Sequence, residues 1–233
     1  MDSNLDKRLA TAYAKANGTK RDMLNSFIAV GIDSATARAQ QFAVPELNRQ
    51  YAEGYNIKKQ NHMRTNEVPN KVAQQTEFGN RVWVHGDVAK TRMQEDLNTN
   101  LARGMTKYDF SRLTRVIPQS GERTDNNLST DMNQLLSRMH TLMRDSGVVN
   151  SNSGYEQANA DNPSDIYIYC KWNTQHDDRV CDVCAPLDGQ IWPWDEAPVP
   201  ITDTHDGCRC WRARCDQDGN IDPDDDYSNP YAA

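Results

Sequence analysis

The stretch that decides the fold runs from Lys171 to Trp211 and reads KWNTQHDDRVCDVCAPLDGQIWPWDEAPVPITDTHDGCRCW. It holds four of the six cysteines and opens them with a Cys-x-x-Cys pair, Cys181 and Cys184. A second group follows a loop that contains four prolines: His205, Cys208 and Cys210. Because each group supplies sulfur or nitrogen donors from one turn, this spacing is typical of a tetrahedral zinc site.

We therefore expect a structural Zn²⁺ ion on four of these side chains: Cys181, Cys184, His205 and Cys208, with Cys210 as the alternative fourth ligand. A segment with so few aliphatic residues buries too little surface to fold alone, so a bound metal would stabilise it directly. A disulfide pair and reduced, unliganded thiols are the alternatives. A redox Cys-x-x-Cys is less favoured, because no apolar parallel strand precedes Cys181.

These residues resemble the carboxy-terminal signature of the Mu F-like head morphogenesis proteins, the minor head (minor capsid) proteins of tailed bacteriophages. That signature has Lys-Trp, Asp-x-Arg-x-Cys-x-x-Cys, Leu-x-Gly and a later His-Pro-x-Cys-Arg-Cys. The matching residues here are Lys171, Trp172, Asp178, Arg179, Cys181, Cys184, Leu187, Gly189, His205, Cys208, Arg209 and Cys210. Asp206 stands where the family usually has proline, and the resemblance covers roughly residues 80 to 213.

Composition limits the class of protein. Hydrophobic residues make up 37% of the 233 residues, below the roughly 45–50% of an average globular domain, which predicts a modest core. No run of about 18 apolar residues is present, and charges occur throughout the first twenty residues, so we expect neither a membrane span nor a signal peptide. We expect the chain in a reducing cytoplasm or in a particle assembled there, where clustered cysteines favour a metal over a disulfide.

Charge is unevenly distributed along the chain. Residues 1–123 hold 19 Lys and Arg against 13 Asp and Glu, and residues 124–233 hold 7 against 20. The basic excess of the first part is that of an ordinary solvated surface, since nucleic-acid footprints are normally denser. No helix-turn-helix or aromatic-interleaved basic motif was recognised in the sequence.

Hydrophobic periodicity predicts helices over most of the chain before the cysteines. In the first part they are expected at about 2–17, from Thr19, at 34–42 and at 45–61, and then at about 80–103, from Thr106 and at 125–145. Thr19 with Asp22, and Thr106 with Asp109, form capping boxes. The clearest core element is one helical seam with alternating spacings of four and three: Leu128, Met132, Leu135, Met139 and Leu142.

Two predictions concern the segments between this seam and the cysteines. Residues 146–163 are rich in Asn, Ser, Gly and Asp, which predicts a flexible loop with no folding drive of its own. Residues 166–171 alternate in polarity and predict a strand that leads to the cysteines. Gly31 and Asp33 predict a turn, and Pro45 predicts the start of a new helix.

The sequence thus predicts an α+β fold that is mostly α-helical, with a small C-terminal β-rich zinc-knuckle lobe. The expected domains are a helical N-terminal arm at 1–79, a head-morphogenesis-like domain at 80–213 with the Cys/His metal knuckle at 171–211, and an acidic C-terminal tail at 214–233.

No catalytic motif was found: there is no Ser/His/Asp order, His-Glu-x-x-His pair, P-loop or Gly-x-Gly-x-x-Gly fingerprint. A closed metal site leaves no position for substrate, so we expect no enzyme and no catalytic or cofactor-binding residues. The resemblance implies a structural minor head protein of the virion, in several copies, that contacts the portal or the major capsid protein and acts in head morphogenesis and in packaging or delivery of the DNA. The alternatives are a nucleic-acid-binding accessory protein and a zinc-dependent enzyme or toxin module.

Overall fold

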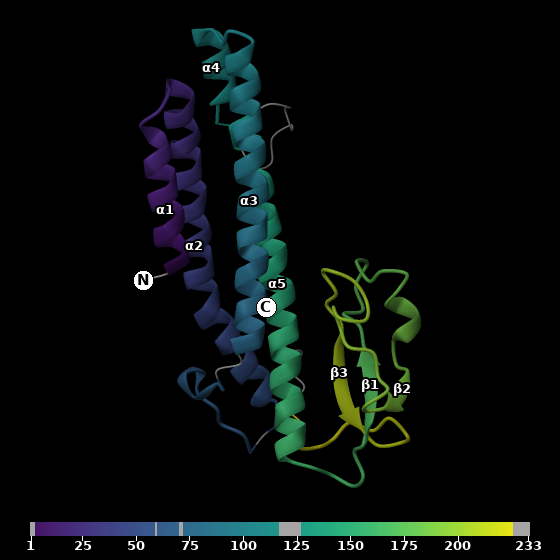
Figure 1. Cartoon of the computed structure of the whole chain (residues 1–233). Coiled ribbons are helices and arrows are strands. Elements are labelled where there is room, and N and C mark those ends of the chain that lie inside the picture. Colours follow the sequence, from purple (N-terminus) through teal and green to yellow (C-terminus); the bar gives the residue numbers. More distant parts are fainter. Residues whose placement is uncertain (1–2, 59, 70–71, 117–126, 226–233) are drawn as a thin grey trace. The chain divides into compact units, whose positions relative to one another are not determined.

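A computed structural model describes residues 3–58, 60–69, 72–116 and 127–225 of the chain. Within these residues, α-helices are followed by a small β-sheet, as the sequence predicted (Figure 1). The α-helices are α1 (Ser3–Ala16), α2 (Lys20–Tyr55), α3 (Val72–Ala102), α4 (Lys107–Leu113) and α5 (Leu128–Asp161). The strands are β1 (Tyr169–Asn173), β2 (Ile191–Pro193) and β3 (Trp211–Cys215), and two 3-10 helices are η1 (Thr65–Glu67) and η2 (Ala185–Leu187).

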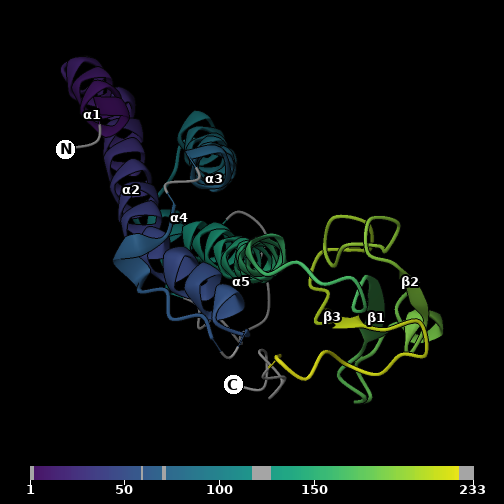
Figure 2. The same ribbon diagram turned by 90° about the horizontal axis from the view of Figure 1, so that it is seen from below.

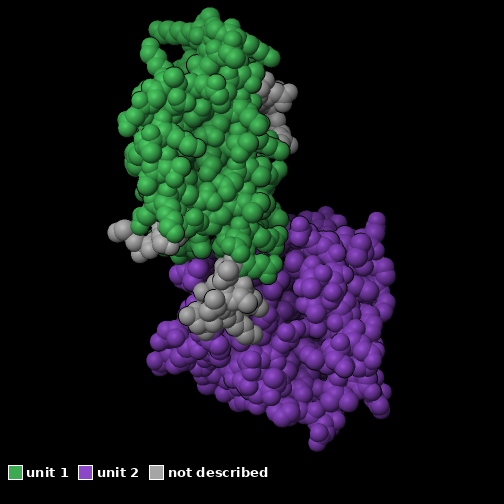
Figure 3. Space-filling view, viewed as in Figure 1, with its two compact units in different colours: residues 1–42, 75–142 green, residues 43–74, 143–233 purple. Residues whose placement is uncertain are grey.

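The chain divides into two compact units (Figure 3). Unit 1 comprises residues 1–42 and 75–142, and unit 2 comprises residues 43–74 and 143–233. Both α2 and α5 contribute residues to each unit. The domain boundaries expected near residues 79 and 213 stay predictions.

Unit 1 has the predicted seam as its core. Leu135 is buried together with Ile32 of α2 and with Ala89 and Met93 of α3. Three more seam residues pack against this cluster while remaining partly exposed: Leu128, Met132 and Met139. The predicted helix began at residue 125, in the part 117–126 that lies outside the described residues; the described helix begins at Leu128.

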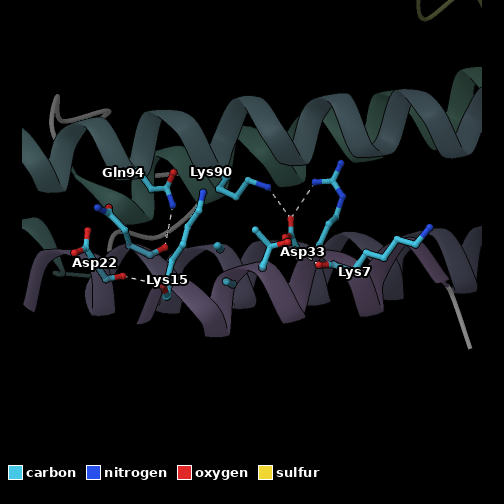
Figure 4. A pocket seen from close by; sticks show the side chains of 12 residues that line it. Lys7, Lys15, Asp22, Asp33, Lys90 and Gln94 are labelled. Atoms are coloured by element: carbon cyan, nitrogen blue, oxygen red, sulfur yellow. Dashed lines mark hydrogen bonds and ion pairs between the residues drawn. The ribbon is translucent and has the colours of Figure 1, made fainter. Parts of the chain in front are cut away.

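Capping boxes and ion pairs fix the ends and neighbours of the helices in unit 1. Asp22 accepts hydrogen bonds from the backbone and hydroxyl of Thr19, and Thr106 caps α4 in the same way with Asp109, so both predicted boxes are confirmed. The carboxylate of Asp33 is buried and is paired with Lys90 Nζ at 3.0 Å, and Figure 4 shows these two side chains reaching toward one another.

The predicted division of α2 is wrong. One helix runs from Lys20 to Tyr55 and includes Pro45, where we had expected a turn near Gly31 and a new helix at Pro45. A proline inside a helix removes one backbone hydrogen bond. Burial offsets this cost, because Leu47 and Tyr51, which follow Pro45, are each 1% exposed.

The loop predicted for residues 146–163 is also wrong, because α5 continues to Asp161. Glycines on α5 and α2 allow the two backbones of unit 2 to touch. A Cβ on Gly154 would lie 2.0 Å from the Tyr51 carbonyl oxygen, and a Cβ on Gly54 would lie 1.9 Å from that of Ser151. Glycine normally indicates a loop, but here it permits a close contact between two helices. This contact stabilises the helix despite the low helix propensity of its residues.

The sheet of unit 2 is antiparallel with β1 in the middle. Figures 1 and 2 show β1 between β2 and β3, and Tyr169 is opposite Pro193 on one side and Cys215 on the other. The strand predicted at 166–171 begins at Tyr169, so Ile166 and Ile168 precede it. Among the described residues, none of the helices is both long and apolar enough to cross a membrane.

Candidate metal centre

The cysteines lie on two turns that the sheet of unit 2 holds in place. Cys181 and Cys184 occupy the turn between β1 and η2, and Cys184 is the residue before η2. Cys208 and Cys210 come directly before β3. Trp172 of β1 is fully buried against these cysteines, so the central strand forms the floor of the cluster.

The five predicted donor side chains come together. His205 Nε2 lies 3.0 Å from Cys181 Sγ and 3.3 Å from Cys184 Sγ, and Cys184 Sγ lies 3.7 Å from Cys208 Sγ. Two triads each have all their ligand atoms within 4.8 Å: Cys181, Cys184 and His205, and Cys184, Cys208 and Cys210. Cys184 belongs to both triads, so the donors form one continuous group.

The sulfur–sulfur distance between Cys184 and Cys208 fits the geometry of one tetrahedral ion. Two sulfurs bound to the same zinc at about 2.3 Å stand about 3.8 Å apart, close to the 3.7 Å between Cys184 Sγ and Cys208 Sγ. The distances from His205 Nε2 to the sulfurs of Cys181 and Cys184 are shorter and are those of hydrogen-bonded pairs. Sulfur and imidazole donors are those that zinc prefers, and the residues therefore fit a zinc ion.

The orientation of the His205 ring favours a ligand role for Nε2. Its Nδ1 lies 2.9 Å from the carbonyl oxygen of Asp206. A carbonyl only accepts, so Nδ1 carries the hydrogen and Nε2 presents its lone pair to the cysteines. This contact uses the backbone of Asp206, so the aspartate at the family's proline position leaves the arrangement intact.

Proton sharing within the cluster is uneven. A hydrogen bond from Cys210 lowers the pKa of the Cys208 thiol to about 5, and the same hydrogen bond raises the pKa of Cys210. Burial raises the pKa of Cys184 to about 12. A cation that binds Cys184 must therefore displace a proton, which makes metal affinity increase with pH.

Two polar contacts that the sequence did not reveal hold the second turn. Asp145 of α5 accepts a hydrogen bond from the Gly207 backbone at 3.0 Å, and Gly207 has a φ of 82°, which favours glycine. Arg209 donates two hydrogen bonds to Asp177, at 2.6 and 2.7 Å. Asp145 and Gly207 are 62 residues apart, so no local pattern indicates their contact.

Unit 1 contains a pocket that lies apart from the Cys/His cluster in the sequence. Side chains of α1, α2 and α3 line it, and Figure 4 shows Lys7, Lys15 and Lys90 with Asp22 and Asp33 around it. Lys90 forms ion pairs with Asp33 and Asp87. The lining contains neither cysteine nor histidine, so it offers none of the soft donors present in unit 2.

A family model described as Phage Mu protein F like protein matches residues 91–213, which is more than half of the 233 residues. The chain belongs to this family. No curated protein and no solved structure matches the chain. The match to the Phage Mu protein F like family ends at residue 213, inside β3. It therefore includes all five donors.

Family membership confirms the resemblance to Mu F-like head morphogenesis proteins and indicates a general function. Phage Mu protein F like proteins are head morphogenesis proteins and not a known enzyme family, so the chain is assigned to the phage head and to interaction with other head components. The Cys/His cluster shows that a metal could be held.

Proposed function

We propose that the chain is a structural minor head protein of a tailed bacteriophage, built into the head at or near the portal during assembly. The observation that carries this proposal is a cluster of five sulfur and nitrogen donors, in two triads that share Cys184, within a family of head morphogenesis proteins. Protein side chains can fill every position of a tetrahedral ion there, so the metal would stabilise the lobe and leave no position for substrate.

The ion we propose is Zn²⁺ on Cys181, Cys184, His205 and Cys208. Support comes from Cys184, because its sulfur lies close both to the sulfur of Cys208 and to the imidazole of His205. In this set Cys210 donates its hydrogen bond to the Cys208 sulfur. In the alternative set Cys210, which belongs to the second triad, takes the place of His205 as the fourth ligand.

The proposed partners are the portal and the major capsid protein, with several copies of the chain in each particle. The proposed location is the virion, after assembly in the host cytoplasm. Contact with packaged DNA is a further part of the proposal, and the Lys and Arg side chains of residues 1–123 are the ones that would carry it. A steep loss of DNA affinity between low and physiological salt is expected if this contact is electrostatic.

Particle composition tests the proposed function. Heads assembled with the wild-type chain should contain it at a fixed ratio to the portal, measured by quantitative mass spectrometry of purified virions. Cys181→Ser or Cys208→Ser should unfold the metal lobe and yield particles that lack the protein. Normal incorporation of both variants would contradict a role for the metal lobe in assembly, and absence of the wild-type chain from virions would contradict the minor head assignment.

A further inference from the structure

Lys58, which follows α2, has its amine buried between two carboxyl groups of the C-terminal segment. Lys58 is 1% exposed, Asp222 is 4% exposed and Asp225 is 7% exposed. The Lys58 Nζ atom lies 2.5 Å from Asp222 Oδ2 and 2.7 Å from Asp225 Oδ1. Lys58 and Asp225 are also partners in an isolated antiparallel β-bridge, so the two side chains leave neighbouring backbones.

The two carboxyl groups meet the amine differently. Asp222 Oδ2 accepts a hydrogen bond from Lys58, and its Oδ1 accepts one from the Asp224 backbone at 3.0 Å. Asp225 Oδ2 accepts a hydrogen bond from the hydroxyl of Tyr155. Its Oδ1 accepts none from the described residues, although Nζ is 2.7 Å away. The amine therefore contacts Asp225 outside hydrogen-bonding geometry.

The burial of this pair bears on the protonation of Asp225. Separate buried charges are costly unless their hydrogen bonds are complete. Burial raises the pKa of the Asp225 carboxyl, although Lys58 and Tyr155 act in the opposite direction. Transfer of a proton from Nζ to Asp225 gives a nucleophilic amine beside a carboxylic acid, which is the pair that condenses to an amide.

We propose that Lys58 and Asp225 form an intramolecular isopeptide bond inside the folded chain. Nζ attacks Cγ of protonated Asp225, Asp222 accepts the proton of the amine, and the same proton passes to the departing hydroxyl. The carbon–oxygen bond to Oδ1 breaks and one water leaves. Oδ2 becomes the amide oxygen, and the Tyr155 hydroxyl stabilises the negative charge that it carries during the attack.

The folded state supplies the driving force for this condensation. Well-oriented groups within one molecule reach effective molarities of about 10⁵ to 10⁸ M. No oxidant, nucleotide or metal takes part in the step. The bond joins the segment after α2 to the acidic segment after β3, and neither a chelator nor a thiol reductant would break it.

Mass spectrometry of the purified, denatured full-length chain tests the proposal. We expect the wild-type mass to be lower than the sequence mass by one water molecule. A tryptic digest should yield a branched peptide that joins Lys58 to Asp225, without cleavage after Lys58. The branched peptide distinguishes the cross-link from dehydration of a single aspartate, which also removes one water.

Three variants and one control locate the chemistry. Lys58→Arg and Asp225→Ala should have their full sequence masses, whereas Asp224→Ala, an exposed neighbour, should keep the link. Asp222→Ala should slow the reaction by about 10²-fold or more, the usual effect of losing a proton-transfer group. A wild-type chain at full sequence mass with a linear peptide ending at Lys58 would overturn the proposal, as would fragment ions that place the link on Asp222.

Discussion

The two halves of α5 show two ways in which this chain obtains a stable helix. In unit 1, residues 128–142 carry a seam of leucine and methionine, with Leu135 buried against aliphatic side chains of α2 and α3. In unit 2, residues 143–161 carry glycine, serine and asparagine, and the backbone itself contacts α2 at Gly154. The first half of α5 is stabilised by the packing of large side chains. The second half is stabilised by a close backbone contact that only glycine permits.

The same contrast extends to the rest of each unit. The core of unit 1 is an aliphatic cluster, whereas the core cluster around Trp172 in unit 2 consists largely of cysteines. Unit 2 also buries the polar side chains of Lys58, Asp222 and Asp225. The buried contacts of unit 2 are thus largely polar or between cysteines, and single changes there should have larger effects than in unit 1.

Removal of the proposed Zn²⁺ ion should give the largest effect. Structural zinc sites contribute about 10 to 16 kcal/mol of apparent binding free energy at neutral pH. Treatment of the full-length chain with a strong chelator should therefore unfold the segment that holds β1, β2 and β3, while most of the far-UV helical signal persists. Limited proteolysis should then cut within residues 171–211 and spare α3.

A matched pair of histidines provides the control. His205→Asn removes a proposed ligand and should reproduce the effect of the chelator, with about one zinc per chain lost in elemental analysis. His176→Asn alters an exposed histidine with a positive φ of 52°, which asparagine tolerates, and should keep the metal. Equal zinc content in both variants would remove His205 from the ligand set.

Glycine substitutions should give the next largest effect. Gly154→Val places a Cβ within 2.0 Å of the Tyr51 carbonyl, so the helices of unit 2 must separate; we expect a loss of about 2 to 4 kcal/mol in the free energy of unfolding. Gly31→Ala is the matched control, because no atom lies within 4 Å of its added Cβ, and it should stabilise α2 by up to about 1 kcal/mol. Urea denaturation measures both, and a similar loss for the two would contradict the close contact.

These glycines also show where sequence reasoning reaches its limit. The capping boxes at Thr19 and Thr106 and the seam around Leu135 were predicted, because each depends on residues three or four positions apart. The second half of α5 was predicted as a loop, because glycine has the same low helix propensity whether or not another backbone packs against it. The contact between Gly154 and α2 depends on the tertiary structure, so the sequence alone does not indicate it.

The candidate metal site likewise has a part that the sequence predicts and a part that it does not. Two donors within each turn follow from local spacing, so Cys181 with Cys184 could be recognised in the sequence. The supports of the site are non-local: Asp145 holds the backbone of Gly207 from a helix 62 residues earlier. Lys58 is 164 residues from Asp222, and only the folded chain brings them together.

The smallest expected effect is in unit 1, at the half-buried carboxyl of Asp131. Burial and the nearby charge of Asp96 raise its pKa from 3.8 to about 6, and its Oδ2 accepts no hydrogen bond from the described residues. The folded state then binds the proton more tightly than the unfolded state, so this group makes stability fall as pH rises from about 4 through about 6.

Asp131→Asn removes this dependence and should stabilise the chain at pH 7.5 by about 1 kcal/mol, a value reduced for solvent screening. The gain should disappear near pH 4, where the wild-type carboxyl is protonated in the folded state. Urea midpoints at the two pH values measure the difference, and Glu95→Gln on the exposed side of α3 controls for the change in net charge. A gain of the same size at both pH values would show that the folded chain does not raise the pKa of Asp131.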